Sequence, residues 1–317
     1  MKQLVILSGK GGTGKTSVVA AFAHLASAGP FAGQVILADA DVDAANLELV
    51  LHPKRLDTEP FRGGEVAVID EDQCVQCGDC ESICRFDAIV ETDAGWIVDP
   101  VACEGCAACV HQCPTASIAM QEQTVGEYAY SDSLYGPLHH AHLYPGQESS
   151  GKLVTEVRQR ACRQALDEQR PLVLIDGPPG IGCPVIAAVS GADLALLVTE
   201  PTVAGLQDLR RALQTLRHFG VPALVCINKA DVYPVGAQGI DAYCRANGID
   251  TVARVPFDPS VPGAMVAGAA VTAYRPDAPA SLALSAVWQQ VVAVLAKDLP
   301  GAAPAATVGD AARNNPD

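Results

Sequence analysis

The feature that most limits what this chain can fold into is the run G-K-G-G-T-G-K-T at residues 9–16, between a strand expected at 3–8 and a helix expected at 16–28. It fits G-x-x-x-x-G-K-[ST], whose glycines let backbone N–H groups reach phosphate oxygens at a helix N-terminus. Lys15 is expected to contact the β- and γ-phosphates, and Thr16 to bind Mg²⁺. The other expected nucleotide contacts are Gly11, Gly12, Thr13, Gly14 and Ser17. A chance glycine-rich turn is disfavoured because strand, loop and helix agree.

Strands and helices are expected to alternate along most of the chain. Apolar runs predict further strands at 34–38, 171–175, 194–198 and 223–227. Helical patterns follow at 152–169, 187–190, 203–219, 236–247 and 282–297. This alternation predicts an α/β fold with a mostly parallel sheet flanked by helices. Residues 127–150 are expected to be irregular, and the tail at 300–317 to be disordered.

Eight of the twelve cysteines form two copies of C-x₂-C-x₂-C-x₃-C, which start at Cys74 and Cys103 and are offset by 29 residues throughout. Four cysteines also suit Zn²⁺, but this spacing, found twice, favours iron–sulfur clusters. The pattern resembles bacterial two-cluster ferredoxins, in which the fourth cysteine of each copy ligates the other cluster. The resemblance implies one [4Fe–4S] cluster on Cys74, Cys77, Cys80 and Cys113, and a second on Cys84, Cys103, Cys106 and Cys109.

Charge marks the same segment as a separate domain. The chain has 36 acidic and 21 basic residues, a net charge of −15, and residues 64–122 hold twelve of the acids against one arginine. We therefore expect an α+β ferredoxin-like domain at 63–122, inserted into an ATPase domain at 1–62 and 123–299. The acidic balance disfavours nucleic acid as a partner. No apolar run of about 18 residues and no signal peptide are seen, so no membrane anchor and a cytoplasmic location are expected.

Lys10, a second lysine within the loop, resembles the extra lysine of the MinD/ParA family, which includes the nitrogenase iron protein and Mrp-type cluster carriers. The resemblance implies an ATP-sandwich dimer in which Lys10 reaches the partner's nucleotide. It also implies that Asp41 orients the attacking water, with Asp43 as a weaker candidate, that Asp39 lies near Mg²⁺ and that Asp176 holds Mg²⁺ through water. The remaining residues that match nucleotide contacts of the family are Gly180 at the γ-phosphate and Asn228, Asp231 and Pro256 around the adenine. Lys10, Lys15 and Asp41 are the expected catalytic residues.

Weaker candidates lie outside these motifs. Cys183 matches the spacing of an interface cluster ligand of the iron protein, but a small residue packed behind the preceding segment is favoured. The histidines at 139, 140 and 142 are expected in a solvated or interface loop, because no carboxylate or cysteine neighbour completes a metal site. Cys162, Cys226 and Cys244 are expected to be packing residues.

Together these features and resemblances imply a slow, partner-stimulated, Mg²⁺-dependent ATPase that couples nucleotide state to electron transfer or metal–sulfur cofactor assembly in an anaerobic-type system. The expected partners are a second copy or a paralogue, and a redox or cofactor protein. One alternative is a ferredoxin-like electron carrier whose ATPase fold only docks, which the intact Lys15, Thr16, Asp41 and Asp176 disfavour. The other is a MinD/ParA-like spatial regulator, which the missing basic amphipathic tail and basic patch disfavour.

Overall fold

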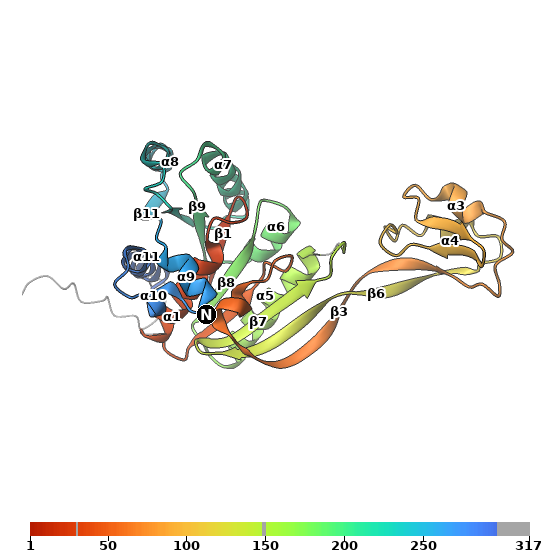
Figure 1. The fold of residues 1–317 in the computed structure, drawn as a ribbon, viewed down its shortest axis with the longest axis horizontal. Coiled ribbons are helices and arrows are strands. Elements are labelled where there is room, and N and C mark those ends of the chain that lie inside the picture. Colours follow the sequence, from red (N-terminus) through yellow and green to blue (C-terminus); the bar gives the residue numbers. More distant parts are fainter. Residues whose placement is uncertain (30, 148–149, 297–317) are drawn as a thin grey trace, which may run out of the picture.

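The computed structural model describes residues 1–29, 31–147 and 150–296, so the tail at 300–317 lies outside the described residues. It shows an α/β body and a small lobe joined by a long two-stranded ribbon (Figure 1). The parallel strands are β1 (Lys2–Ser8), β2 (Val35–Asp39), β7 (Gly136–Leu143), β8 (Leu172–Pro179), β9 (Leu194–Thr199), β10 (Ala223–Asn228) and β11 (Asp250–Val255). With β3 (Lys54–Ile69) and β6 (Ile118–Ser133) they form, within the described part, a nine-stranded sheet of order β11-β10-β9-β1-β8-β2-β7-β6-β3. The predicted α/β fold is confirmed.

Helices cover both faces of this sheet, as strands that are apolar on both sides require. One face carries α1 (Lys15–Ser27), α2 (Leu47–Leu51), α9 (Ser260–Val266), α10 (Val271–Tyr274) and α11 (Pro279–Ala296). The other carries α5 (Ser150–Asp167), α6 (Cys183–Val189), α7 (Val203–His218) and α8 (Pro234–Ala246). Because parallel strands end at one edge of a sheet, the loops after β1, β2, β8 and β9 meet there.

Helix α11 departs from one expectation. By length and composition, this helix of 18 residues is apolar enough to cross a membrane. From the sequence we expected no such segment. Leu284, Val287 and Val291 are buried in the core beside α1, and the Trp288 ring lies 5.0 Å from that of Phe22. The helix is apolar because it packs as a core helix, as its predicted stripe indicated.

The segment expected to be irregular, 127–150, instead contains most of an antiparallel hairpin. Residues 126–133 of β6 pair with 136–143 of β7, and β7 pairs in parallel with β2. Three histidines concealed this strand, and side chains on β6 bond to one ring nitrogen of two of them: Tyr128 to His139 and Ser131 to His140. His140 Nε2, for example, lies 2.8 Å from Ser131 Oγ.

The same hairpin joins the body to the lobe. Strand β6 pairs with β7 only from Gly126 onward, and before that point it pairs with β3 alone as an extended ribbon (Figure 1). The pairing register is irregular between Phe61 and Glu65 of β3. The expected domain boundaries at 62/63 and 122/123 fall at this irregularity, inside two continuous strands. Two paired strands, rather than unpaired linkers, therefore connect the two parts.

The cysteine lobe, residues 63–122, is built as a structural repeat. It contains α3 (Asp79–Ile83), β4 (Ile89–Thr92), β5 (Gly95–Val98) and α4 (Ala108–Gln112). Left-handed φ values recur at three pairs of positions 29 residues apart: Gln76 and Gly105, Gly78 and Ala107, and Asp87 and Ala116. Backbone hydrogen bonds cross between the copies, since Asp70 N–H donates to the Ser117 carbonyl and Asp99 N–H to the Ala88 carbonyl. Each copy is completed by the other.

Candidate functional site

The phosphate loop lies at the carboxyl end of β1 and opens α1. Gly12 and Gly14 have φ values of 78° and 96°, which side chains with a Cβ rarely adopt. A Cβ on Gly14 would lie 2.5 Å from Asn228 Nδ2, whereas one on Gly11 or Gly12 would meet nothing within 4 Å. Thr13 Oγ1 is buried and has no hydrogen-bond partner among the described residues. The loop is therefore packed against the protein at Gly14 and unobstructed at Gly11 and Gly12, where a phosphate group could approach its backbone.

Two of the three expected catalytic residues lie together. Lys15 Nζ is 3.7 Å from Asp41 Oδ2, and both side chains are largely buried. Burial raises the pKa of Asp41, while the charge of Lys15 opposes that rise. The Asp41 carboxylate thus pairs with the Lys15 ammonium, which could instead contact the phosphate of a bound nucleotide.

Asp176 has the properties of a cation ligand. Both of its carboxylate oxygens are buried, and neither makes a hydrogen bond within the described part of the chain. Burial raises the pKa of Asp176 to about 7, against Thr16 and Lys15, which lower it. A buried carboxylate without partners is costly unless a cation or proton neutralises it. The residues present therefore fit Mg²⁺, which Asp176 and Thr16 would hold and which would neutralise phosphate charge.

The Asp39 carboxylate is hydrogen-bonded to the backbone of the loop that follows β2. It lies opposite Asp176 in the pairing of β2 with β8, but its oxygens accept N–H bonds from Asp41 at 3.2 Å and Leu47 at 3.0 Å. Burial and then the nearby Asp176 raise the pKa of Asp39 well above its usual value. Asp39 thus holds the loop that carries Asp41, and its place beside Mg²⁺ stays a prediction.

Two expected nucleotide contacts are occupied by protein groups. Asn228 Nδ2 donates to the Thr13 carbonyl at 2.8 Å, so this side chain braces the phosphate loop. The Gly180 N–H, expected to face the γ-phosphate, donates to the Ser8 carbonyl at 2.9 Å. The single N–H of Gly180 would have to change partner to contact a nucleotide, whereas the Asn228 amide keeps a second N–H for one.

The segments expected around the adenine are joined to each other. Asp231 Oδ1 accepts the Phe257 N–H at 2.6 Å, which fixes the half-buried Pro256 beside the loop after β10. Ser17, in the first turn of α1, donates its hydroxyl to Met265 Sδ at 3.4 Å on α9.

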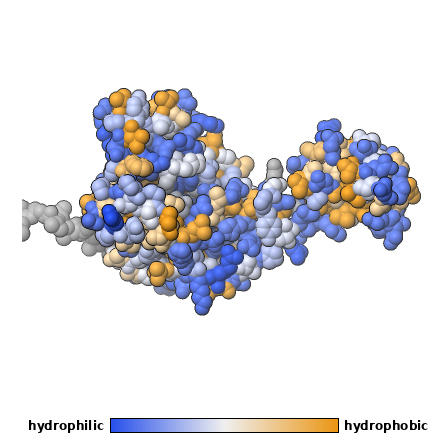
Figure 2. All heavy atoms as spheres, in the orientation of Figure 1, coloured by the Kyte–Doolittle hydropathy of each residue, from blue (hydrophilic) through white to orange (hydrophobic). Residues whose placement is uncertain are grey.

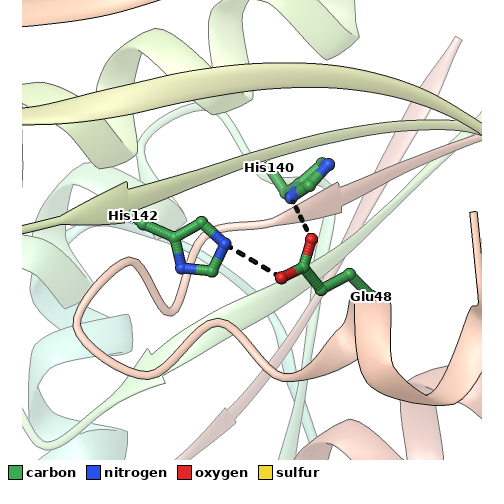
Figure 3. A group of neighbouring side chains, drawn as sticks. All are labelled: Glu48, His140 and His142. Atoms are coloured by element: carbon green, nitrogen blue, oxygen red, sulfur yellow. Dashed lines mark hydrogen bonds and ion pairs between the residues drawn. The ribbon is translucent and has the colours of Figure 1, made fainter. Parts of the chain in front are cut away.

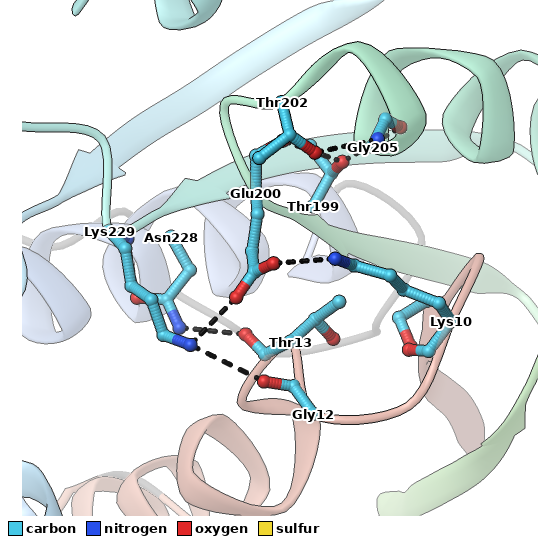
Figure 4. Close-up of polar contacts among 10 residues, drawn as sticks. Lys10, Gly12, Thr13, Thr199, Glu200, Thr202, Gly205, Asn228 and Lys229 are labelled. Carbon is cyan, nitrogen blue, oxygen red and sulfur yellow. Dashed lines mark hydrogen bonds and ion pairs between the residues drawn. The ribbon is translucent and has the colours of Figure 1, made fainter. Parts of the chain in front are cut away.

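Sequence reasoning missed the ion-pair network that holds Lys10. Lys10 Nζ lies 2.8 Å from Glu200 Oε2, and Lys229 Nζ lies 2.7 Å from Glu200 Oε1 and 3.4 Å from the Gly12 carbonyl (Figure 4). Glu200 directly follows β9, which pairs with β1. An acidic residue directly after a predicted parallel strand is expected at the carboxyl edge of the sheet, and this position could have indicated Glu200 as a neighbour of the phosphate loop. The carboxylate keeps Lys10 beside its own loop.

We predict that Glu200→Gln increases ADP affinity about three- to tenfold, because it removes a negative charge beside an anion site and leaves two lysines there. Titration calorimetry at low and high salt measures this, and the gain should shrink as salt rises. Glu168→Gln is the matched control, since Glu168 pairs with Arg170 beyond the opposite end of β8. An unchanged or weaker affinity would show that Glu200 acts by bracing the loop instead.

The eight clustered cysteines surround two small cavities in the lobe. Cys74, Cys77, Cys80 and Cys113 line one of them, and Cys84, Cys103, Cys106 and Cys109 line the other. None of these eight cysteines forms a disulfide in the described part of the chain. These are the two sets that the ferredoxin resemblance implies. Four thiol donors around one cavity fit a [4Fe–4S] cluster or Zn²⁺.

The remaining cysteines divide by exposure. Cys226 and Cys244 are buried, as expected, and Cys162 is half-buried. Cys183, the first residue of α6, is exposed, so the favoured packing role is wrong. Helical side chains tilt toward the helix N-terminus, so no preceding turn covers the side chain of Cys183 at the start of α6.

The histidines at 139, 140 and 142 lie on β7, so the expected loop is wrong. His139 bonds to Tyr128 and, at 2.6 Å, to Gln164, and burial lowers the pKa of both His139 and His140 to about 4. A carboxylate neighbour, which the sequence analysis did not find, is supplied by Glu48 of α2.

Comparison with known proteins agrees with this architecture. The model of the CobQ/CobB/MinD/ParA nucleotide-binding domain matches residues 4–271. An uncharacterized protein of Methanocaldococcus jannaschii is 35% identical over 227 residues, 72% of this chain and 78% of that protein. An iron–sulfur cluster carrier protein of Pyrococcus furiosus is 26% identical over 165 residues, 48% of this chain and 55% of that protein.

Among solved structures, the septum site-determining protein MinD of Pyrococcus horikoshii, complexed with Mg-ADP, superposes with a TM-score of 0.55 at 20% identity. The match covers 94% of this chain and 99% of that one, and it shows a shared fold. The family model spans well over half of the chain and includes the phosphate loop, Asp41 and Asp176. The protein therefore belongs to the CobQ/CobB/MinD/ParA nucleotide-binding family.

Proposed function

We propose that this protein is a Mg²⁺-dependent ATPase that carries two [4Fe–4S] clusters in the cysteine lobe and uses nucleotide state to control electron transfer or metal–sulfur cofactor assembly. Clusters of this type, held by cysteine thiolates, supply one-electron transfer when bound. Cysteines in this number outside disulfides are typical of a reducing compartment, and we propose the cytoplasm.

One observation carries the coupling: paired strands run without a break from the phosphate site to the cysteine lobe. Asp39, at the end of β2, lies opposite His140 of β7. Strand β7 pairs with β6, and β6 continues with β3 into the lobe. The loop at 40–46, which carries Asp41, thus follows β2, and β2 pairs with β7, the strand that holds β6 in the sheet. A shift of this loop on ATP binding would be passed to the ribbon.

Similarity to the iron–sulfur cluster carrier protein supports the cluster part of the proposal, over about half of each chain. Two properties of the lobe suit a docking partner. It is strongly acidic, and it exposes large apolar residues, of which Val75 and Phe86 line the cysteine cavities. Figure 2 shows such hydrophobic patches among hydrophilic residues on the lobe face in view. A redox or cofactor protein with a basic rim would fit this surface.

The phosphate site suggests the second partner. In an ATP-sandwich dimer, of two copies or of this chain with a paralogue, Lys10 would leave Glu200 and reach the partner's nucleotide. The side chain of Lys10 is 40% exposed, so it can exchange one anionic partner for another without crossing the core.

The test is the reduction potential of anaerobically purified protein with and without Mg-ATP. Tenfold coupling between ATP affinity and cluster redox state moves a one-electron potential by about 60 mV. We expect a shift of at least this size. A protein without iron–sulfur signals would refute the cluster assignment.

An unchanged potential with active ATP hydrolysis would instead favour ATP-driven partner docking or cofactor transfer. An unchanged potential without hydrolysis would favour a plain electron carrier.

A further inference from the structure

Three side chains far apart in the sequence meet at the junction of α2 and β7. Glu48 comes from α2, and His140 and His142 from alternate positions of β7, so both imidazoles point to the same side of the strand (Figure 3). His140 Nδ1 lies 3.3 Å from Glu48 Oε2, and His142 Nε2 lies 3.1 Å from Glu48 Oε1. One ligand atom from each residue lies within 4.8 Å of the other two.

The two distances between histidine nitrogens and Glu48 oxygens, 3.3 and 3.1 Å, are close to the donor separations of a metal site. Donors bound to one tetrahedral ion at 2.0–2.2 Å are separated by about 3.4 Å. Two imidazoles and one carboxylate are donors that bind Zn²⁺ and other first-row divalent ions.

A second observation concerns His140 alone. Its side chain is buried, and its Nδ1 makes no hydrogen bond within the described residues although it faces Glu48. Its other nitrogen, Nε2, lies 2.8 Å from Ser131 Oγ. A ligating histidine usually donates its second N–H to such a partner, which fixes the ring. If Nε2 carries the proton, the Nδ1 lone pair faces a carboxylate oxygen, an arrangement that a cation would stabilise.

From this geometry we infer that Glu48, His140 and His142 form a binding site for a divalent first-row transition-metal ion such as Zn²⁺ or Co²⁺. The site lies outside the cysteine cavities and the phosphate loop, and it does not depend on the proposed function. An ion there would join α2, which follows the Asp41 loop, to the strand that supports the ribbon.

One neighbouring group competes with the ion. Arg55 Nη2 lies 3.3 Å from Glu48 Oε2, and its Nη1 lies 3.1 Å from Glu127 Oε1. The Arg55 side chain is 42% exposed, so its guanidinium can keep Glu127 when an ion takes Glu48. Its positive charge should nevertheless weaken metal binding.

The experiment measures Co²⁺ bound by the full-length protein, dialysed without oxygen against Co²⁺. His142→Ala is the main variant because His142 is 31% exposed and its loss should not unfold the body. We expect the wild type to bind about one more Co²⁺ per chain than this variant, or to bind it at least about tenfold more tightly. The extra ion should lack thiolate-to-cobalt charge-transfer absorption, which separates it from Co²⁺ on cysteines.

Two further variants sharpen the test. Arg55→Gln should tighten Co²⁺ binding about threefold or more, an effect that a purely structural role of the cluster would not produce. His218→Ala, at an exposed histidine on α7, should change nothing. Equal Co²⁺ binding by the wild type and His142→Ala would overturn the inference, as would weaker binding by Arg55→Gln.

Discussion

A Cys113→Ala variant is expected to lose about half of the iron and acid-labile sulfide of the protein while keeping its ATPase body folded. Cys113 lies in the second copy of the motif, yet it lines the cavity formed by three cysteines of the first copy, Cys74, Cys77 and Cys80. Losing one of four thiolates should release that cluster and leave the other, which needs none of these residues. Iron and sulfide assays with electron paramagnetic resonance of the reduced protein measure the loss.

Double variants distinguish ligation across the copies from ligation within each copy. Cys113→Ala with Cys103→Ala removes one residue from each cavity, so both clusters should be lost. Cys113→Ala with Cys74→Ala removes two residues from one cavity, so about half of the iron should remain. Ligation within each copy predicts the reverse for both pairs.

The half-buried Cys162 provides the control, and Cys162→Ala should retain all of the iron. Full iron retention in Cys113→Ala would reject the assignment of this residue as a ligand. Zinc in place of iron in protein purified without oxygen would reject the iron–sulfur assignment as a whole.

The parallel part of the fold was predictable because its signals are local. Apolar runs at β1, β8 and β9 and the glycines after β1 specify strands and a phosphate loop without reference to distant residues. The cysteine spacing acts in the same way, since a repeat of 29 residues in sequence becomes a repeat of left-handed φ values in structure. The resemblance to the MinD/ParA family, which these motifs support, assigned Lys15, Asp41 and Asp176 to one nucleotide site.

The rest could not be predicted because it depends on pairing between distant segments. Strand β7 contains three histidines among eight residues, and it is a strand because β2 and β6 hydrogen-bond to its two edges. Glu48 lies far along the sequence from His140, so no spacing rule relates them. Glu200 contacts Lys10 only because β9 is placed beside β1. In each case tertiary contacts decided the environment of a residue whose local signal was weak.

An Asp41→Ala variant is expected to lose at least about 100-fold in ATP turnover while it still binds ATP. A carboxylate that positions the attacking water contributes on this scale. The same substitution removes an anion beside the phosphate site and frees Lys15 from its 3.7 Å contact. ATP affinity should therefore stay the same or increase, whereas the rate falls. Phosphate release and equilibrium ATP binding, measured on one preparation, separate these two effects.

Asp43→Ala is the matched comparison, because Asp43, the weaker candidate for the same role, lies two residues further along the loop and is exposed. Its turnover should stay within about twofold of the wild type. Iron content should be unchanged in both variants, because neither residue approaches the cysteine lobe. If Asp41→Ala hydrolyses ATP at the wild-type rate, Asp41 is not the water-positioning residue. If it instead loses ATP binding, the residue serves the loop structure, as Asp39 does through its bonds to the backbone of Asp41 and Leu47.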